Sequence, residues 1–90
     1  MLKNLEDLIK TIRDRKNSSR EKSYTSKLLN DKNLSVSKVK EEVDELIEAV
    51  EKNTNKIHES ADVIYHLLVY LEANNIKIED VMKELEKRKK

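Results

Sequence analysis

The chain has neither glycine nor proline among its 90 residues. Proline breaks helices and glycine weakens them, whereas the abundant lysine, glutamate and leucine favour them. The lack of glycine also excludes the usual glycine-rich phosphate loops, and the lack of cysteine excludes disulfides and thiolate metal sites. The composition therefore predicts a single all-α domain over residues 1–90, in which any phosphate must be bound by metal ions and basic side chains.

The spacing of apolar residues divides the first half of the chain into helices. It predicts an amphipathic helix over residues 2–16 and a short helix over 24–29. After a polar break at 30–33, Ser35 or Ser37 is expected to cap a long helix.

The second half begins with a break at 53–55 and is predicted to hold a long helix over 56–72, with Thr54 as its N-cap, and a short last helix. The segment 61–71 is apolar on nearly every side, and such a helix is buried on every side. One chain of this length has too few helices to surround it. We therefore predict a bundle of four to five helices that assembles through its helices into a homodimer.

Acidic residues stand on two neighbouring helical stretches at spacings of three or four, so each set shares one face: Glu41, Glu42 and Glu45, then Glu59 and Asp62. A short break at 53–55 makes the two helices antiparallel neighbours, so the sets can face each other. Asp62 opens the apolar segment, where an uncompensated carboxylate is costly. A hard divalent cation, above all Mg²⁺, would satisfy this cluster, whereas the first set alone is typical of a solvated surface.

Histidine and charge give weaker indications. His66, one turn after Asp62, is more typical of a core histidine with hydrogen-bonded ring nitrogens than of a metal ligand. The alternative is that its ring N–H donates a hydrogen bond to a carboxylate and holds it in place. With 19 basic and 18 acidic residues the net charge is +1, which does not favour nucleic acid or an anionic membrane as a partner. No apolar run can span a bilayer and the first residues lack the apolar block of a signal peptide, so a cytoplasmic protein is expected.

The acid pattern Glu41-Glu42-x-x-Glu45 and Glu59-x-x-Asp62 resembles the signature of the MazG-like, all-α nucleotide pyrophosphohydrolases. Flanking sequence narrows the resemblance to the phosphoribosyl-ATP pyrophosphohydrolase family. It includes Ser23-Tyr24-Thr25 and the run from Tyr65 to Val69, and the resemblance extends over essentially all of the chain.

The resemblance implies hydrolysis of phosphoribosyl-ATP to phosphoribosyl-AMP and pyrophosphate, the second step of histidine biosynthesis, with Mg²⁺ as cofactor. It implies that the metal is held by Glu42, Glu45, Glu59 and Asp62. Glu41 would be a further ligand or the general base. The nucleotide also needs cationic and hydroxyl contacts, for which the candidates are Ser23, Tyr24, Thr25, Lys27 and Lys38, and more weakly Arg13, Arg15 and Arg20.

Two other functions stay open at this point. One is a housecleaning pyrophosphohydrolase that removes non-standard nucleoside triphosphates on the same fold with the same metal. The other is a non-catalytic helical dimerisation module, whose acids would form a solvated stripe. The residues outside the acid pattern favour the histidine-pathway enzyme over the former, and Mg²⁺ binding would argue against the latter.

Overall fold

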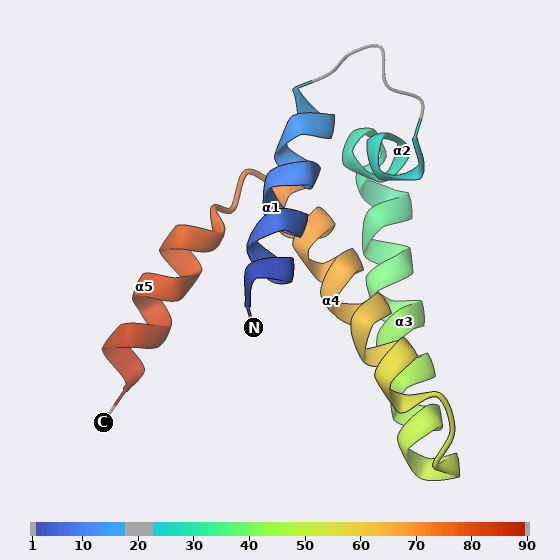
Figure 1. Ribbon diagram of the computed structural model, residues 1–90. Helices are drawn as coiled ribbons and strands as arrows, with labels where there is room; N and C mark the ends of the chain where they lie inside the picture. Colours follow the sequence, from blue (N-terminus) through green and yellow to red (C-terminus); the bar gives the residue numbers. More distant parts are fainter. Residues whose placement is uncertain (1, 18–22, 90) are drawn as a thin grey trace.

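The computed structural model describes residues 2–17 and 23–89, and this part of the chain is all-α, as predicted. Its helices are α1 (Lys3–Lys16), α2 (Tyr24–Asn30), α3 (Lys32–Lys52), α4 (Lys56–Ala73) and α5 (Ile78–Arg88). α3 and α4 form a long antiparallel pair, α1 and α2 pack against α4, and α5 points away from the rest (Figure 1). Over the described residues, no helix combines the length and the apolar character that crossing a bilayer requires.

The boundary between α2 and α3 is shorter than the sequence predicted. Asp31 alone separates the two helices, and its Oδ1 accepts a hydrogen bond of 3.0 Å from the backbone N–H of Leu34. The break predicted at 30–33 is therefore present but only one residue long, and the predicted caps Ser35 and Ser37 are wrong. An aspartate that caps the next helix can turn the chain within one residue, and this leaves Ser35 buried inside α3.

Asparagine makes the turns on either side of α4. Asn53 and Asn55 have φ angles of 56° and 47°, and Asn75, after α4, has a φ of 60°. Asparagine is the residue besides glycine that most readily adopts this left-handed conformation. The break at 53–55 is confirmed, but the N-cap is Asn55, which makes no side-chain cap bond, and the prediction of Thr54 was wrong. A two-asparagine turn is thus what sets α3 and α4 side by side.

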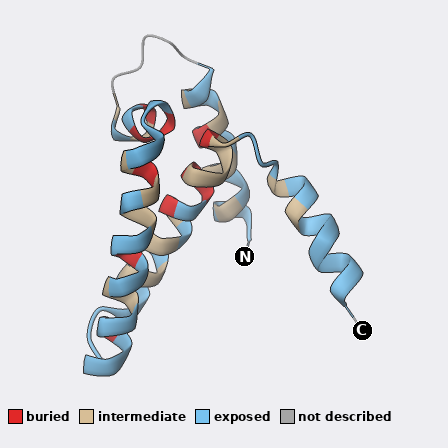
Figure 2. Cartoon of the chain, turned by 180° about the vertical axis from the view of Figure 1, so that it is seen from behind, coloured by how far each residue is buried: buried red, intermediate tan, exposed pale blue. Residues whose placement is uncertain are grey.

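The core lies where α1, α2 and α4 meet (Figure 2). Its buried apolar residues are Ile12, Leu28, Leu29, Leu68, Val69 and Ala73. The segment 61–71 is not buried on every side, because Ile64 is 48% and Leu67 41% exposed. α5 has no buried residue in the described chain. The α3–α4 pair therefore leaves part of its apolar surface uncovered by its own chain.

Ion pairs join α1 to α4 and α5. The guanidinium of Arg13 donates to both carboxylate oxygens of Glu79, at 2.8 and 2.5 Å, and this lowers the pKa of Glu79 to about 2. Lys16 Nζ donates to the backbone oxygen of Glu72 at 2.8 Å and to Oδ1 of Asn75 at 2.7 Å. The guanidinium of Arg13 is therefore paired with an acid of α5. This weakens the prediction that Arg13 contacts the substrate.

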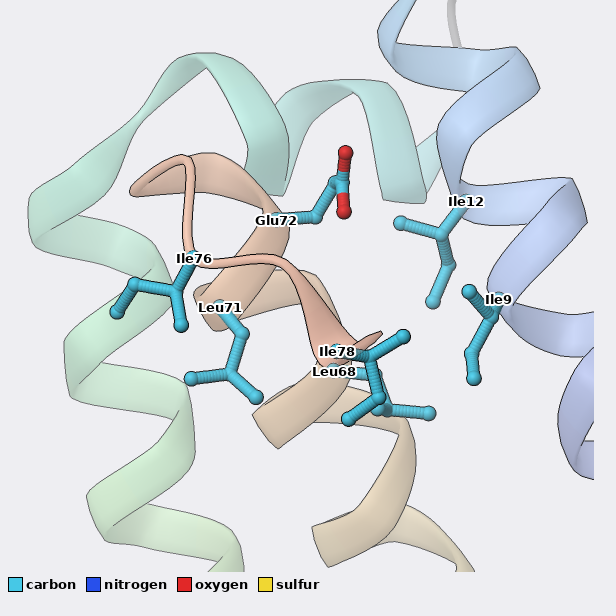
Figure 3. A pocket seen from close by; sticks show the side chains of 7 residues that line it. All are labelled: Ile9, Ile12, Leu68, Leu71, Glu72, Ile76 and Ile78. Atoms are coloured by element: carbon cyan, nitrogen blue, oxygen red, sulfur yellow. The ribbon is translucent and has the colours of Figure 1, made fainter. Parts of the chain in front are cut away.

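A small cavity of about 10 Å³ lies between α1, α4 and the start of α5 (Figure 3). Its lining is apolar except for Glu72: Ile9, Ile12, Leu68, Leu71, Ile76 and Ile78. The Glu72 carboxylate lies 3.5 Å from Arg13 Nε and 3.7 Å from Lys16 Nζ. A partly buried carboxylate is thus compensated by two cations of α1, so Glu72 has no need of a metal ion.

Candidate active site

Acids of α3 and α4 converge at the middle of the antiparallel pair. One carboxylate oxygen from each of Glu42, Glu45 and Glu59 lies within 4.8 Å of the others. A second group, which shares Glu59, consists of His58, Glu59 and Asp62. The prediction that the two acid sets face each other is confirmed, because the 53–55 turn brings the first half of α4 level with the middle of α3.

The buried member of this cluster is Glu42, which lies in the middle of α3 and is only 8% exposed. Its Oε2 and the Oε2 of Glu59 are buried, and neither has a hydrogen-bond partner within the described residues. Burial, followed by the neighbouring Glu45 carboxylate, raises the pKa of Glu42 to about 7. Burial and Glu45 also raise the pKa of Glu59. An uncompensated pair of this kind needs protons or a cation.

The donor set fits a hard cation. Three carboxylates from two helices supply only oxygen atoms, which are the ligands that Mg²⁺ and Mn²⁺ prefer. The unpartnered oxygens of Glu42 and Glu59 are where a cation would restore the balance of charge. A solvated acidic stripe would instead leave all its carboxylates exposed, so the burial of Glu42 disfavours that alternative.

Glu41 and Lys38 form a pair beside the cluster. Glu41 is exposed, belongs to neither group of converging ligands in the described chain, and lies 3.1 Å from Lys38 Nζ. This contact raises the pKa of the Lys38 ammonium. Lys38 also faces Tyr24 closely enough to oppose the rise that burial causes in the pKa of the Tyr24 hydroxyl. The role of Glu41 as a ligand or base stays a prediction.

The predicted substrate segment at the start of α2 is hydrogen-bonded to α4. The hydroxyl of Tyr24 lies 3.0 Å from His66 Nε2, and Thr25 Oγ1 lies 2.5 Å from the hydroxyl of Tyr65. The Oγ of Ser23 accepts from the backbone of α2 as its N-cap. These hydroxyls therefore position α2, and Tyr24, which is 47% exposed, is the one that also presents a large surface to solvent.

His66 is the satisfied core histidine that the sequence favoured, since it is buried and uses both ring nitrogens. Its Nδ1 lies 2.8 Å from the backbone oxygen of Asp62, not from the carboxylate. A carbonyl oxygen only accepts, so Nδ1 donates, and Nε2 of the neutral ring accepts from the hydroxyl of Tyr24. Through this ring, α2 is linked to the turn of α4 that carries Asp62.

Two further candidates lie elsewhere or outside the described chain. Lys27 is exposed on α2, one turn from the hydroxyl segment, and its role stays a prediction. Arg20 falls outside the described residues. Sequence reasoning missed His58, although its position four residues before Asp62 places both on one helix face. His58 Nε2 lies 3.3 Å from Asp62 Oδ2.

The link between Thr25 and Tyr65 gives a stability prediction. Replacing Thr25 with Val or Tyr65 with Phe should each lower the free energy of unfolding by about 1–2 kcal/mol, because the remaining hydroxyl loses its partner. The double variant should lose less than the sum of the two, a coupling of about 1 kcal/mol that urea denaturation of the four proteins measures. Additive losses would mean that the two hydroxyls do not interact.

Comparisons with known proteins show which family this sequence resembles. The family described as phosphoribosyl-ATP pyrophosphohydrolase matches residues 5–89. The phosphoribosyl-ATP pyrophosphatase of Clostridium novyi is 46% identical over 92 residues, which cover 96% of this chain and 81% of that protein. Its counterpart in Clostridium acetobutylicum is 50% identical over 90 residues, covering 93% and 79%. The histidine biosynthesis bifunctional protein HisIE of Pyrococcus furiosus is 44% identical over 91 residues, covering 100% and 42%. This chain belongs to the phosphoribosyl-ATP pyrophosphohydrolase family.

Proposed function

We propose that this protein hydrolyses phosphoribosyl-ATP to phosphoribosyl-AMP and pyrophosphate in histidine biosynthesis, with Mg²⁺ as its cofactor. The family match and the names of the relatives support the substrate and the pathway. The single observation that carries the metal is the buried Glu42, which has a carboxylate oxygen without a hydrogen-bond partner in the described chain and converges with Glu45 and Glu59.

The proposed roles follow from where the side chains lie. Glu42, Glu45, Glu59 and Asp62 would hold Mg²⁺, which when bound supplies neutralisation of phosphate charge and activation of the attacking water. Lys38, next to the cluster, would contact the phosphate oxygens and give up its pairing with Glu41. The Glu41 carboxylate, freed from that pairing, would accept the proton of the attacking water as the general base. Tyr24 would lie against the nucleotide with its proton already committed to His66.

The test is a comparison of substrates. Pyrophosphate release with Mg²⁺ is expected to be much faster from phosphoribosyl-ATP than from ATP or from non-standard nucleoside triphosphates at equal concentration. Activity confined to the non-standard nucleotides would favour a housecleaning enzyme. Calorimetry without any Mg²⁺ binding, together with no hydrolysis, would favour the non-catalytic module. In cells, the gene should restore growth without histidine to a strain that lacks this step.

We also propose that the protein is a homodimer held together by α3 and α4. The argument is the apolar surface that one chain leaves open on this pair. On α3, Val43, Ile47 and Val50 follow one another at helical spacing and are 36%, 52% and 58% exposed. On α4, Ile64 and Leu67 are similarly open. Large exposed apolar residues on two adjacent helices are typical of subunit contacts.

Disruption of this surface gives a prediction about assembly. Leu67→Glu should convert a dimer into a monomer at micromolar concentration in sedimentation velocity, because a carboxylate would be buried without a partner. Leu85→Glu changes a leucine of α5 that is 54% exposed and should leave the dimer intact. A wild-type protein that sediments as a stable monomer would contradict the proposal.

A further inference from the structure

The hydroxyl group of Tyr24 begins a chain of hydrogen bonds that runs from α2 into α4. It lies 3.0 Å from His66 Nε2, and His66 Nδ1 lies 2.8 Å from the backbone oxygen of Asp62. Because a carbonyl oxygen has no proton to give, Nδ1 carries the hydrogen of the neutral ring and Nε2 has only a lone pair. The hydroxyl of Tyr24 therefore donates to His66, and its oxygen can only accept from any further partner.

The ring of Tyr24 is held in place as well as its hydroxyl. It stacks on Tyr65, with 6.4 Å between the ring centroids and 21° between the planes, and it meets His66 edge-on at 5.8 Å. Tyr65 is in turn hydrogen-bonded to Thr25 of α2. Even so, Tyr24 is 47% exposed, whereas His66 is buried. A side chain that is fixed in this way and still reaches solvent is preorganised to meet a ligand in one orientation.

The neighbours of Tyr24 belong to the site proposed for phosphate chemistry. Burial raises the pKa of the Tyr24 hydroxyl, and the nearby Lys38 ammonium opposes this rise without cancelling it, so the phenol keeps its proton near neutral pH. Lys38 has three N–H donors and no acceptor, which suits phosphate oxygens. The oxygen of Tyr24 has the opposite character, because a phosphate oxygen is itself an acceptor and cannot donate to it.

We propose that Tyr24 accepts a hydrogen bond from the nucleoside part of the substrate, and that His66 is the positioning residue that makes Tyr24 an acceptor. The inference rests on the proposed function and adds the direction in which the nucleotide lies, with the nucleoside toward α2 and the phosphates toward Lys38 and the carboxylates. The donor is the amino group of the base or a ribose hydroxyl, which share this chemistry. A free phosphate compound has neither and gains nothing from Tyr24.

The direction of the hydrogen bonds can be measured without any substrate. The chain has only two histidines, so ¹⁵N-histidine NMR of metal-free protein without a histidine tag at pH 8 gives two sets of ring resonances, and His58→Gln assigns the remaining set to His66. We expect a protonated Nδ1 and an unprotonated Nε2 for His66. A proton on Nε2 would make Tyr24 the acceptor of that bond and would overturn the inference.

Product inhibition tests which part of the nucleotide Tyr24 meets. In Tyr24→Phe the inhibition constant of phosphoribosyl-AMP should rise about five- to tenfold, because one hydrogen bond is lost. The inhibition constant of pyrophosphate, measured at the same Mg²⁺ concentration, should change by less than about twofold. Tyr70→Phe makes the same chemical change on α4 and should change neither constant by more than about twofold. An equal weakening of both inhibitors in Tyr24→Phe, or of neither, would overturn the inference.

Variants of His66 separate a positioning role from a merely structural one. His66→Leu removes the acceptor, so it should weaken phosphoribosyl-AMP about as much as Tyr24→Phe does, and the double variant should lose no more than either, because both act through one hydroxyl. His66→Gln, whose amide oxygen can accept the same proton, should stay within about threefold of the wild type. A merely structural histidine would weaken phosphoribosyl-AMP and pyrophosphate alike. If His66→Leu does not fold, as circular dichroism would show, the NMR result decides.

Two analogues of AMP identify the donor. Inosine monophosphate replaces the amino group of the base with a carbonyl oxygen, and 2′-deoxy-AMP and 3′-deoxy-AMP each lack one ribose hydroxyl. The analogue that lacks the donor should inhibit the wild type more weakly than AMP does, and this difference should vanish in Tyr24→Phe. Differences that all persist in Tyr24→Phe would overturn the inference. Failure of the proposed function would appear separately, as a lack of pyrophosphate release from phosphoribosyl-ATP by the wild type.

Discussion

Asp62→Asn should lower kcat/KM for phosphoribosyl-ATP by about a thousandfold or more while leaving the fold intact. Loss of a metal ligand removes several kcal/mol of charge stabilisation, and each 1.4 kcal/mol corresponds to about a factor of ten in rate. The fold should survive because the contact that Asp62 makes with His66 uses its backbone oxygen, which asparagine retains. Steady-state pyrophosphate release and circular dichroism measure the two effects.

The matched control for this variant is Asp44→Asn. Asp44 is an exposed acid on α3 that belongs to neither group of converging ligands in the described chain. Its replacement makes the same chemical change and should alter kcat/KM by less than about twofold, as surface substitutions usually do. Near-normal turnover of Asp62→Asn with Mg²⁺ would remove Asp62 from the proposed metal ligands.

Glu42→Gln should stabilise the metal-free protein at pH 8. In the folded state the pKa of Glu42 is raised to about 7, from an ordinary value of 4.5, so the folded protein holds this proton more tightly than the unfolded chain does. The stabilisation is fully present below about pH 4.5 and is lost as the pH rises through about 7. Across this range the loss is on the order of 2–3 kcal/mol. Glutamine does not ionise, so the variant should not lose this stability as the pH rises.

Urea denaturation with EDTA at pH 5 and pH 8, at one protein concentration, measures this difference. The wild type should lose stability between the two values, and Glu42→Gln should lose clearly less. Glu51→Gln, an exposed position on the same helix, should behave as the wild type. With saturating Mg²⁺ the wild type should become more stable than Glu42→Gln at pH 8, because ligand at about 100 times its Kd stabilises the wild type by about 2.7 kcal/mol. Equal pH dependence in the two proteins would mean that Glu42 ionises freely in the fold.

The helices and the acid cluster were open to prediction because they depend on local rules. Apolar spacing located each of the five helices of the described residues, and the short 53–55 break was enough to predict that Glu45 and Glu59 face each other. The capping residues were not predictable in the same way. Asp31 and Ser35 are both acceptable caps by residue type, and the choice between them depends on where α2 packs, which is a property of the tertiary structure.

Other parts of the site depend on contacts between distant segments. No spacing rule relates Thr25 to Tyr65 or Tyr24 to His66, which are 40 and 42 residues apart in the chain. The ion pairs of Arg13 with α5 were equally hidden, so a structural arginine looked like a substrate contact. His58 did carry a local signal, its i, i+4 relation to Asp62. It was overlooked because the acids alone formed a complete pattern.

The left-handed asparagines have a consequence for the chemical durability of the protein. Asparagine residues age by attack of the following backbone nitrogen on the side-chain amide, and this attack is fastest when glycine follows, because glycine leaves the backbone free to reach the cyclic geometry. Here Asn53, Asn55 and Asn75 are followed by Thr54, Lys56 and Ile76. The left-handed turns of this chain use asparagine, and without glycine the chain never contains the asparagine-glycine pair in which asparagine decays soonest. The asparagines in the turns around α4 should therefore lose their side-chain amides more slowly than asparagines that are followed by glycine.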